Sequence, residues 1–153
     1  MRRVLSACVA CLVMFTAGCG GDDDLRVAGT TIDGALDSDE RIVPVLEASE
    51  TILGQPLEWP SGPATLTSVV LTMQPGEETG RHYHEAPLYA LILEGTLTVD
   101  YGENGTRTYR EGDALMEAQE IVHNGMNLSD EPVKLLVLNM GAEGVANTVL
   151  VDE

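Results

Sequence analysis

From residue 65 onward the chain is a series of short segments rich in threonine, valine and leucine, separated by turns that contain glycine. Residues 65–73, 96–101 and 106–109 alternate between polar and apolar side chains, which is the period of a strand with one buried face. The last two segments are joined by Gly102-Glu103-Asn104-Gly105, and Asn-Gly tolerates the positive φ of a tight hairpin. No helical period is evident after residue 19. The sequence therefore predicts an all-β domain of antiparallel strands.

Two further segments, residues 88–93 and 132–140, are almost continuously apolar and also predict strands. With a period of two, the side chains of Leu88, Ala90 and Ile92 share one face of the first strand, and the residues between them share the other. We expect the first face to line the interior of the domain. The opposite face is expected to meet another sheet or a second subunit, so the pattern allows a homodimer.

The segments at the two ends of the domain give weaker signals. Residues 42–46 and 51–53 are expected to form its first strands, and residues 145–151 a last edge strand. Trp59, the single tryptophan, is expected to cover one end of the core. The roughly 110 residues after the first 41 are enough for one compact domain and not for two.

All three histidines of the chain lie between residues 75 and 127. His82 and His84 are two positions apart, so in a strand their imidazoles point to the same side. His123 follows the predicted hairpin, and an antiparallel return would bring it opposite the pair. Neutral imidazoles are good ligands for divalent transition metals, and three protein ligands leave coordination positions open for a substrate. The alternative is a metal-free barrel whose histidines bind an organic ligand.

The spacing around these histidines resembles the two motifs of the cupin superfamily. The first reads Gly-x5-His-x-His, with a glycine after the following strand, and the second has a glycine ahead of His-x3-Asn. The matching residues are Gly76, His82, His84, Gly95, Gly112, His123 and Asn127. The resemblance implies an antiparallel β-barrel, the double-stranded β-helix or jelly roll. It also implies that His82, His84 and His123 hold a divalent ion, which the family pattern allows to be Fe, Zn, Ni, Mn or Cu.

The chain departs from the cupin pattern at three positions. The motif glutamate, a metal ligand in the family, falls on Leu88, and the proline and glycine of the second motif fall on Ala118 and Glu120. Glu85 adjoins the histidine pair and could replace the missing ligand, but its odd parity relative to His84 points it away in a regular strand. Without a carboxylate, a bound ion keeps both positive charges in an apolar cup, which favours small anionic ligands over neutral ones.

The remaining polar residues near the motifs receive supporting roles. Backbone carbonyls or Asn127 are the candidates to hold the second nitrogen of each histidine. Glu117, like Glu120, is expected to be a solvated loop charge, and Tyr83, Tyr101 and Tyr109 are expected to be packing residues. The sequence therefore identifies no catalytic acid or base. The pocket is expected to comprise Leu88, Ala90, Ile92 and Asn127.

An all-histidine site of this kind resembles that of the thiol dioxygenases and acetylacetone dioxygenase. The resemblance implies a metal-dependent oxidoreductase that acts on a small molecule. The alternative is a non-catalytic protein that binds or senses a small ligand. No acid–base group is apparent beside the motifs, which disfavours an isomerase or a hydrolase.

Residues 1–19 are predicted to be a processing segment. Arg2 and Arg3 precede a short apolar stretch that ends in Thr16-Ala17-Gly18-Cys19, which resembles a bacterial lipoprotein signal in which Cys19 is lipidated. We therefore expect an exported lipoprotein of the cell envelope, anchored by lipid and facing the periplasm or the exterior. An ordinary secretory signal is the alternative. Either cleavage leaves the mature chain without a cysteine pair for a disulfide.

The domain boundaries follow from composition. Residues 20–41 are acidic and poor in large apolar side chains, so they predict a flexible tether. Residues 42–153 are then expected to form the cupin domain that the resemblance implies. The chain has 25 acidic and 8 basic residues and a formal net charge of −17. Such a charge disfavours binding to nucleic acid or to anionic lipid surfaces, so contact with the membrane is expected through the lipid anchor alone.

Overall fold

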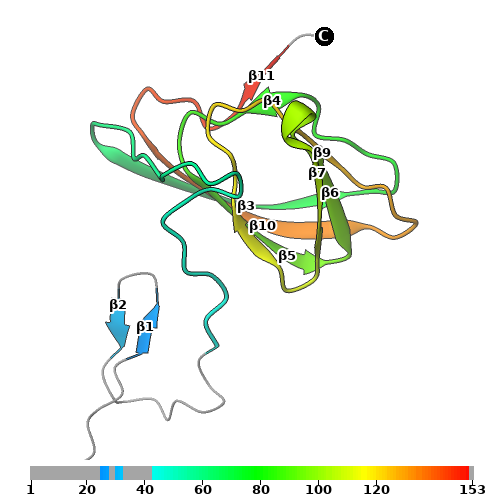
Figure 1. Cartoon of the computed structure of the whole chain (residues 1–153), viewed down its shortest axis with the longest axis horizontal. Helices are drawn as coiled ribbons and strands as arrows, with labels where there is room; N and C mark the ends of the chain where they lie inside the picture. The colour runs from blue at the N-terminus through cyan, green and yellow to red at the C-terminus, as the bar shows by residue number, and fades with distance from the viewer. Residues whose placement is uncertain (1–24, 28–29, 33–42, 152–153) are drawn as a thin grey trace, which may run out of the picture.

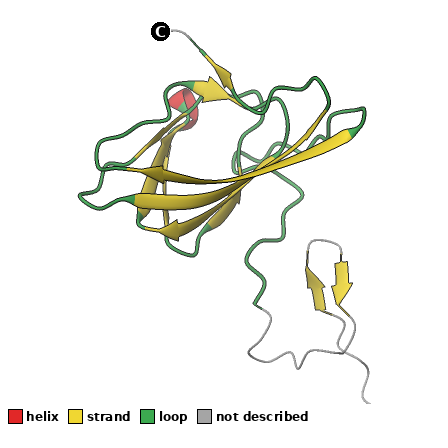
Figure 2. Cartoon of the chain, turned by 180° about the vertical axis from the view of Figure 1, so that it is seen from behind, coloured by secondary structure: helices red, strands yellow, loops and turns green. Residues whose placement is uncertain are grey.

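The computed structural model describes residues 25–27, 30–32 and 43–151. These residues form antiparallel strands and a single 3₁₀ turn, so the predicted all-β class is confirmed (Figures 1 and 2). The strands of the domain are β3 (Ala64–Met73), β4 (His82–Tyr83), β5 (Leu88–Glu94), β6 (Thr96–Asp100), β7 (Thr106–Arg110), β8 (Ala114–Met116), β9 (Asn124–Met126), β10 (Val133–Ala142) and β11 (Val149–Leu150). The 3₁₀ turn, η1 (Gly102–Asn104), connects β6 and β7.

The strands make two main sheets whose inner faces share one core. A four-stranded sheet has the order β3-β10-β5-β8, and a three-stranded sheet has the order β7-β6-β9. A third, two-stranded sheet pairs β11 with β4. In the described part of the chain these ladders do not join into one closed barrel, in contrast to the expectation. Isolated bridges connect the sheets instead, among them His82 with His123 and Glu78 with Met126, and the jelly-roll arrangement is retained.

The core follows the period of two that the sequence shows. On β5, Leu88, Ala90 and Ile92 are buried, whereas the intervening residues are half-buried or exposed. The inward side chains pack against Leu97 and Val99 from β6 in one apolar cluster. Burying such side chains contributes about 1.5–3 kcal/mol each, so the alternation on β5 largely determines which face of the sheet becomes the interior.

The segment before β3 contains turns where strands were expected. Residues 43–48 have no regular structure, and residues 52–54 form a turn. Thr51 Oγ1 accepts hydrogen bonds from Leu53 N and Gln55 N, each at 3.3 Å, and Gly54 has a φ of 78°. Such local side-chain bonds favour a turn over a strand. Trp59 is 61% exposed and does not cover the core, so that prediction is wrong.

The outer face of β5 is bordered by this same segment. A surface cavity lies between Leu46, Leu57 and Trp59 on one side and Tyr89 and neighbouring side chains of the four-stranded sheet on the other. Ile52 donates its backbone N–H to the Met116 carbonyl at 2.8 Å. The chain itself therefore borders a face that we expected a sheet or subunit to cover.

Two smaller predictions are refined. The β6–β7 hairpin is confirmed, but its positive φ angles are 62° at Gly102 and 83° at Gly105 rather than at Asn104. The predicted last strand is shorter, because only β11 pairs, with β4. Within the predicted tether, β1 (Leu25–Val27) pairs with β2 (Thr30–Ile32). The signal segment and the rest of the tether lie outside the described residues, and the described part contains no helix able to span a membrane.

Candidate metal centre

Backbone pairing between two segments that are distant in the sequence brings the three histidines together. His82 N donates to the His123 carbonyl at 2.9 Å, and His123 N donates to the His82 carbonyl at 2.8 Å. This reciprocal pair is an antiparallel bridge and confirms that the chain returns opposite the His-x-His segment. The turn before it depends on glycine, since Gly76 and Gly80 have φ angles of 78° and 77°. Glu120 N donates to the His84 carbonyl at 2.9 Å and fixes the second histidine.

The imidazoles converge on one point. One ring nitrogen from each of His82, His84 and His123 lies within 4.8 Å of the corresponding nitrogens of the other two. The ring centroids are 4.4 to 5.0 Å apart, and all three side chains are buried. Ligand nitrogens of a single zinc-like ion lie about 2.0–2.1 Å from it, so opposed nitrogens lie about 4 Å apart. The cluster therefore needs only small movements to enclose an ion.

Backbone carbonyls fix the orientation of each ring. The Nδ1 atoms of His82, His84 and His123 lie 2.8, 2.7 and 2.8 Å from the carbonyl oxygens of Gly80, Asn147 and Ile121, respectively. A carbonyl oxygen only accepts hydrogen bonds, so each Nδ1 must carry the hydrogen. In the neutral imidazole, Nε2 then has a free lone pair. Three such lone pairs face the same small volume, which suits a cation.

Burial keeps two of these rings neutral near physiological pH. Desolvation lowers the pKa of His84 from 6.5 to about 4, although the hydrogen bond to the Asn147 carbonyl raises this pKa. Desolvation also lowers the pKa of His82, and its carbonyl bond to Gly80 opposes this. The neighbouring histidine charges act in the same direction as burial for both rings. A neutral imidazole is the form that binds metal.

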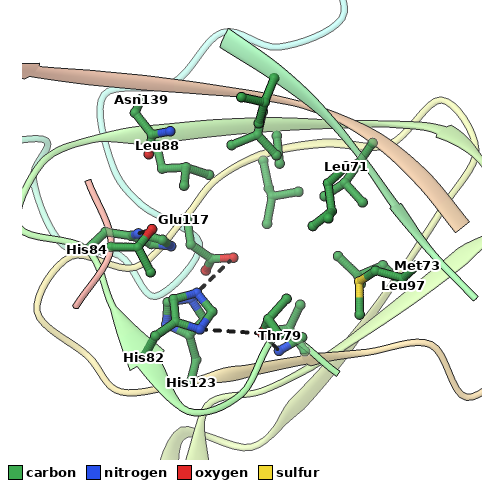
Figure 3. Close-up of a pocket in the computed structure, with 18 residues that line it drawn as sticks. Leu71, Met73, Thr79, His82, His84, Leu88, Leu97, Glu117, His123 and Asn139 are labelled. Carbon is green, nitrogen blue, oxygen red and sulfur yellow. Dashed lines mark hydrogen bonds and ion pairs between the residues drawn. The ribbon is translucent and has the colours of Figure 1, made fainter. Parts of the chain in front are cut away.

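The histidines form one wall of a cavity of about 240 Å³ (Figure 3). Leu88 and Ala90 line it, as expected, together with Val99, Leu115, Leu135 and Val137. Ile92 is on the same face of β5 but is part of the buried core and does not reach the cavity lining. The site thus has a polar wall of imidazoles and an apolar wall built by the two main sheets.

The prediction that Glu117 is a solvated loop charge is wrong. It is only 6% exposed and lines the histidine cavity. Its Oε1 accepts hydrogen bonds from Tyr101 Oη at 2.7 Å and from Ala118 N at 2.9 Å, and its Oε2 lies 3.9 Å from His123 Nε2. The missed signal is parity, because Glu117 is two positions after the buried Leu115 and shares its inward face.

Tyr101 is buried, as expected of a packing residue, but its hydroxyl also makes specific hydrogen bonds. It donates to Glu117 and lies 3.3 Å from the hydroxyl of Tyr109. Burial raises the pKa of Tyr101 well above its usual range, and the Glu117 charge acts in the same direction. The tyrosine therefore remains a hydrogen-bond donor to the carboxylate.

The other polar candidates lie away from the ring nitrogens. Asn127 is fully buried, and its amide donates to the carbonyls of Met73 and Glu131 at 3.0 and 2.8 Å, so it does not hold a histidine. Of the two candidates for that role, the backbone carbonyls are the ones in place. Glu85 is exposed and accepts from Ala146 N at 3.1 Å, in agreement with its predicted outward direction. Glu120 is exposed, with a φ of 56°.

Residues 69–139 match the family described as Cupin domain. Among solved structures, the oxalate decarboxylase of Lactobacillus farciminis, as a formate complex, has 18% identity and a TM-score of 0.49 over 57% of this chain and 27% of that one. A DMSP lyase from Ruegeria pomeroyi has 27% identity and a TM-score of 0.49, over 56% and 43%. A sugar phosphate isomerase of the cupin superfamily from Silicibacter pomeroyi has 21% identity and a TM-score of 0.46, over 57% of each chain. The chain thus covers less than two thirds of each of these proteins, and no curated protein matches it.

Proposed function

We propose that this chain is a cupin, since residues 69–139 match the Cupin domain family, and that it binds one divalent metal ion through His82, His84 and His123 and presents it to a small molecule. The observation that carries this proposal is the convergence of three buried imidazoles whose Nδ1 atoms are all committed to carbonyls. That arrangement directs the remaining nitrogen of each ring to a common point.

The donor set fits a transition metal. Neutral imidazoles suit divalent Fe, Zn, Ni or Cu better than the hard ions Mg²⁺ and Ca²⁺, which prefer oxygen ligands. When bound, the ion would supply a Lewis acid with open coordination positions. The chain's own part is to keep His82 and His84 neutral through burial, to orient all three rings through the backbone carbonyls, and to exclude bulk water with the apolar wall.

The cavity sets the size and the charge of the ligand. A volume of about 240 Å³ is below the range of roughly 300–1,000 Å³ that is usual for drug-sized ligands, so the ligand is small. The anionic preference predicted from the sequence assumed a site without a carboxylate. Glu117 adds one negative charge to the two positive charges of the ion, so the attraction to an anion is reduced but keeps its sign.

The experiment that tests metal binding is elemental analysis of the natively purified protein, followed by calorimetric titration of the chelator-treated protein with Zn²⁺ and Co²⁺. We expect one ion per chain, and its loss in the His82→Ala, His84→Ala and His123→Ala variants. Equal metal content in wild type and in all three variants would rule the proposal out.

For the reaction itself, we propose a metal-dependent oxidoreductase of the dioxygenase type. Support comes from the all-histidine nitrogen donors and from the open, apolar side of the cavity. Oxygen uptake by the Fe²⁺-loaded protein with thiols, β-diketones and phenols tests it. Ligand binding without oxygen uptake across the panel would favour a non-catalytic binding or sensing protein instead.

We also propose that the protein is an exported lipoprotein anchored through Cys19. The support is the sequence alone, in which Thr16-Ala17-Gly18 precedes the cysteine after a short apolar stretch. Metabolic labelling with a fatty acid should modify the wild type and not the Cys19→Ser variant. Equal labelling of the two would refute the anchor.

A further inference from the structure

The carboxylate that the cupin pattern places at position 88 has a structural counterpart on the neighbouring strand. The β5–β8 ladder pairs Tyr89 with Met116 and Ala90 with Leu115, and continuing this register by one residue past β8 places Glu117 opposite Leu88. Glu117 N donates to the Leu88 carbonyl at 2.8 Å. Both side chains line the histidine cavity. Residues 88 and 117 are therefore facing neighbours, and a carboxylate at either position enters the same space.

Hydrogen bonds divide the two oxygens of Glu117 between different tasks. Oε1 is anchored by Tyr101 Oη at 2.7 Å and by the backbone N–H of Ala118 at 2.9 Å. Oε2 lies 3.9 Å from His123 Nε2, and Figure 3 shows the carboxylate directed into the cavity beside the histidines. A carboxylate that binds a metal is usually arranged in this way: hydrogen bonds hold one oxygen in place, and the other oxygen faces the remaining metal ligands.

One distance, between Glu117 and His123, agrees with a shared ion. Two ligand atoms that each lie about 2.0–2.2 Å from one ion are about 4.2 Å apart when opposed and closer when adjacent. The 3.9 Å between Oε2 and the His123 nitrogen lies within that limit. It is also longer than a hydrogen bond, since such bonds span about 2.7–3.2 Å. A hydrogen bond to His123 therefore does not fix the position of Oε2.

We propose that Glu117 is the fourth protein ligand of the metal centre, replacing from the end of β8 the carboxylate that Leu88 lacks. Tyr101 is a positioning residue that holds the ligand through Oε1. This inference rests on the proposed metal site. It predicts a centre with three nitrogen ligands and one oxygen ligand from the protein, one position fewer for substrate than a three-histidine centre has.

The test compares metal binding by the whole chain in five forms: wild type, Glu117→Gln, Tyr101→Phe, the exchange variant Leu88→Glu with Glu117→Leu, and Glu120→Gln as a matched control. Glu120 is an exposed glutamate three positions away and does not line the cavity. Calorimetric titration with Zn²⁺ and Co²⁺ gives affinity, and the visible spectrum of the Co²⁺ form reports its coordination. Thermal unfolding of each metal-free variant checks the fold.

We expect Glu117→Gln to weaken metal binding by about 100-fold and to change the Co²⁺ spectrum. We expect Tyr101→Phe to weaken it by about 10-fold, as is usual for the loss of an outer-shell partner, while Glu120→Gln matches wild type. The exchange variant should recover much of the affinity lost in Glu117→Gln. A purely structural role for Glu117 as the partner of Tyr101 would not be restored by a carboxylate at position 88.

The outcomes separate this inference from the proposed function. If wild type and Glu117→Gln bind metal equally well and have the same Co²⁺ spectrum, Glu117 is not a ligand, and the proposal of a three-histidine site is unaffected. Wild type that binds no metal would overturn both. If Glu117→Gln fails to fold, Tyr101→Phe decides, because it keeps the carboxylate, and unaltered affinity and spectrum in that variant would overturn the inference.

Discussion

In the metal-free protein, acid should destabilise the fold through His84. Burial lowers the pKa of His84 from 6.5 to about 4 in the folded state, and the unfolded chain has the ordinary value. As the pH falls through this window, the unfolded state takes up the proton first. The free energy of unfolding therefore falls between about pH 6.5 and pH 4, and it is independent of this group above that window.

The magnitude follows from the width of the window. At about 1.4 kcal/mol for each pH unit, the span from 6.5 to about 4 corresponds to about 3 kcal/mol from His84. His82 adds to this in the same direction, because its pKa is also lowered. A small domain has only about 5–15 kcal/mol of stability, so the predicted loss is a large share of the total.

Urea denaturation of the chelator-treated protein, measured in steps from pH 7.5 to pH 4, tests this prediction. The control is His84→Gln, because the 25 acidic residues of the chain also titrate in acid and contribute equally to both proteins. The wild type should lose about 3 kcal/mol more than the variant over the window. If the two curves stay parallel from pH 6.5 to pH 4, the reasoning from burial is refuted.

Three further predictions concern packing and assembly. Ile92→Ala should lower the free energy of unfolding by about 2–5 kcal/mol, because Ile92 is 1% exposed. The control Val43→Ala should have little effect, because Val43 is 74% exposed. Equal effects of the two substitutions in urea denaturation would contradict this prediction. Asn127→Ala should cost about 2–4 kcal/mol, because it removes the amide donor to the Met73 carbonyl and one of the two side-chain donors to the Glu131 carbonyl. An unchanged urea midpoint would argue against this. The apolar outer face that includes Leu93, 37% exposed, predicts a dimer at micromolar concentration, and sedimentation of a monomer alone would count against that.

The parts that the sequence predicts well depend on short-range geometry. The period of two assigns β5 its inward face, and the same rule places His82 and His84 on one side of the chain. The approach of His123 follows from an antiparallel return after a hairpin whose glycines are visible in the sequence. For the first two the information lies within a few residues, whereas the approach of His123, 41 positions after His82, is indicated by the spacing of the cupin-like motifs.

The parts that it predicts poorly depend on partners distant in the sequence. The sequence predicts a solvated loop charge at Glu117, yet Tyr101, 16 positions earlier, donates a hydrogen bond to its buried carboxylate. The segment around Thr51 has the composition of a strand, but its hydroxyl bonds stabilise a turn. Trp59 shows the same limit, because whether a large side chain is covered depends on neighbours that no local pattern specifies.

The pairing of β4 with β11 has a consequence for the rate of metal exchange. Only two residue pairs join these strands, and the segment leading into β11 supplies the Asn147 carbonyl that orients His84. Short, peripheral pairings open at a much lower free-energy cost than the core does. Metal should therefore enter and leave through fraying of the segment near the C-terminus, so that the lifetime of the bound ion follows the hydrogen-exchange protection of residues 147–151 and not the global stability of the fold.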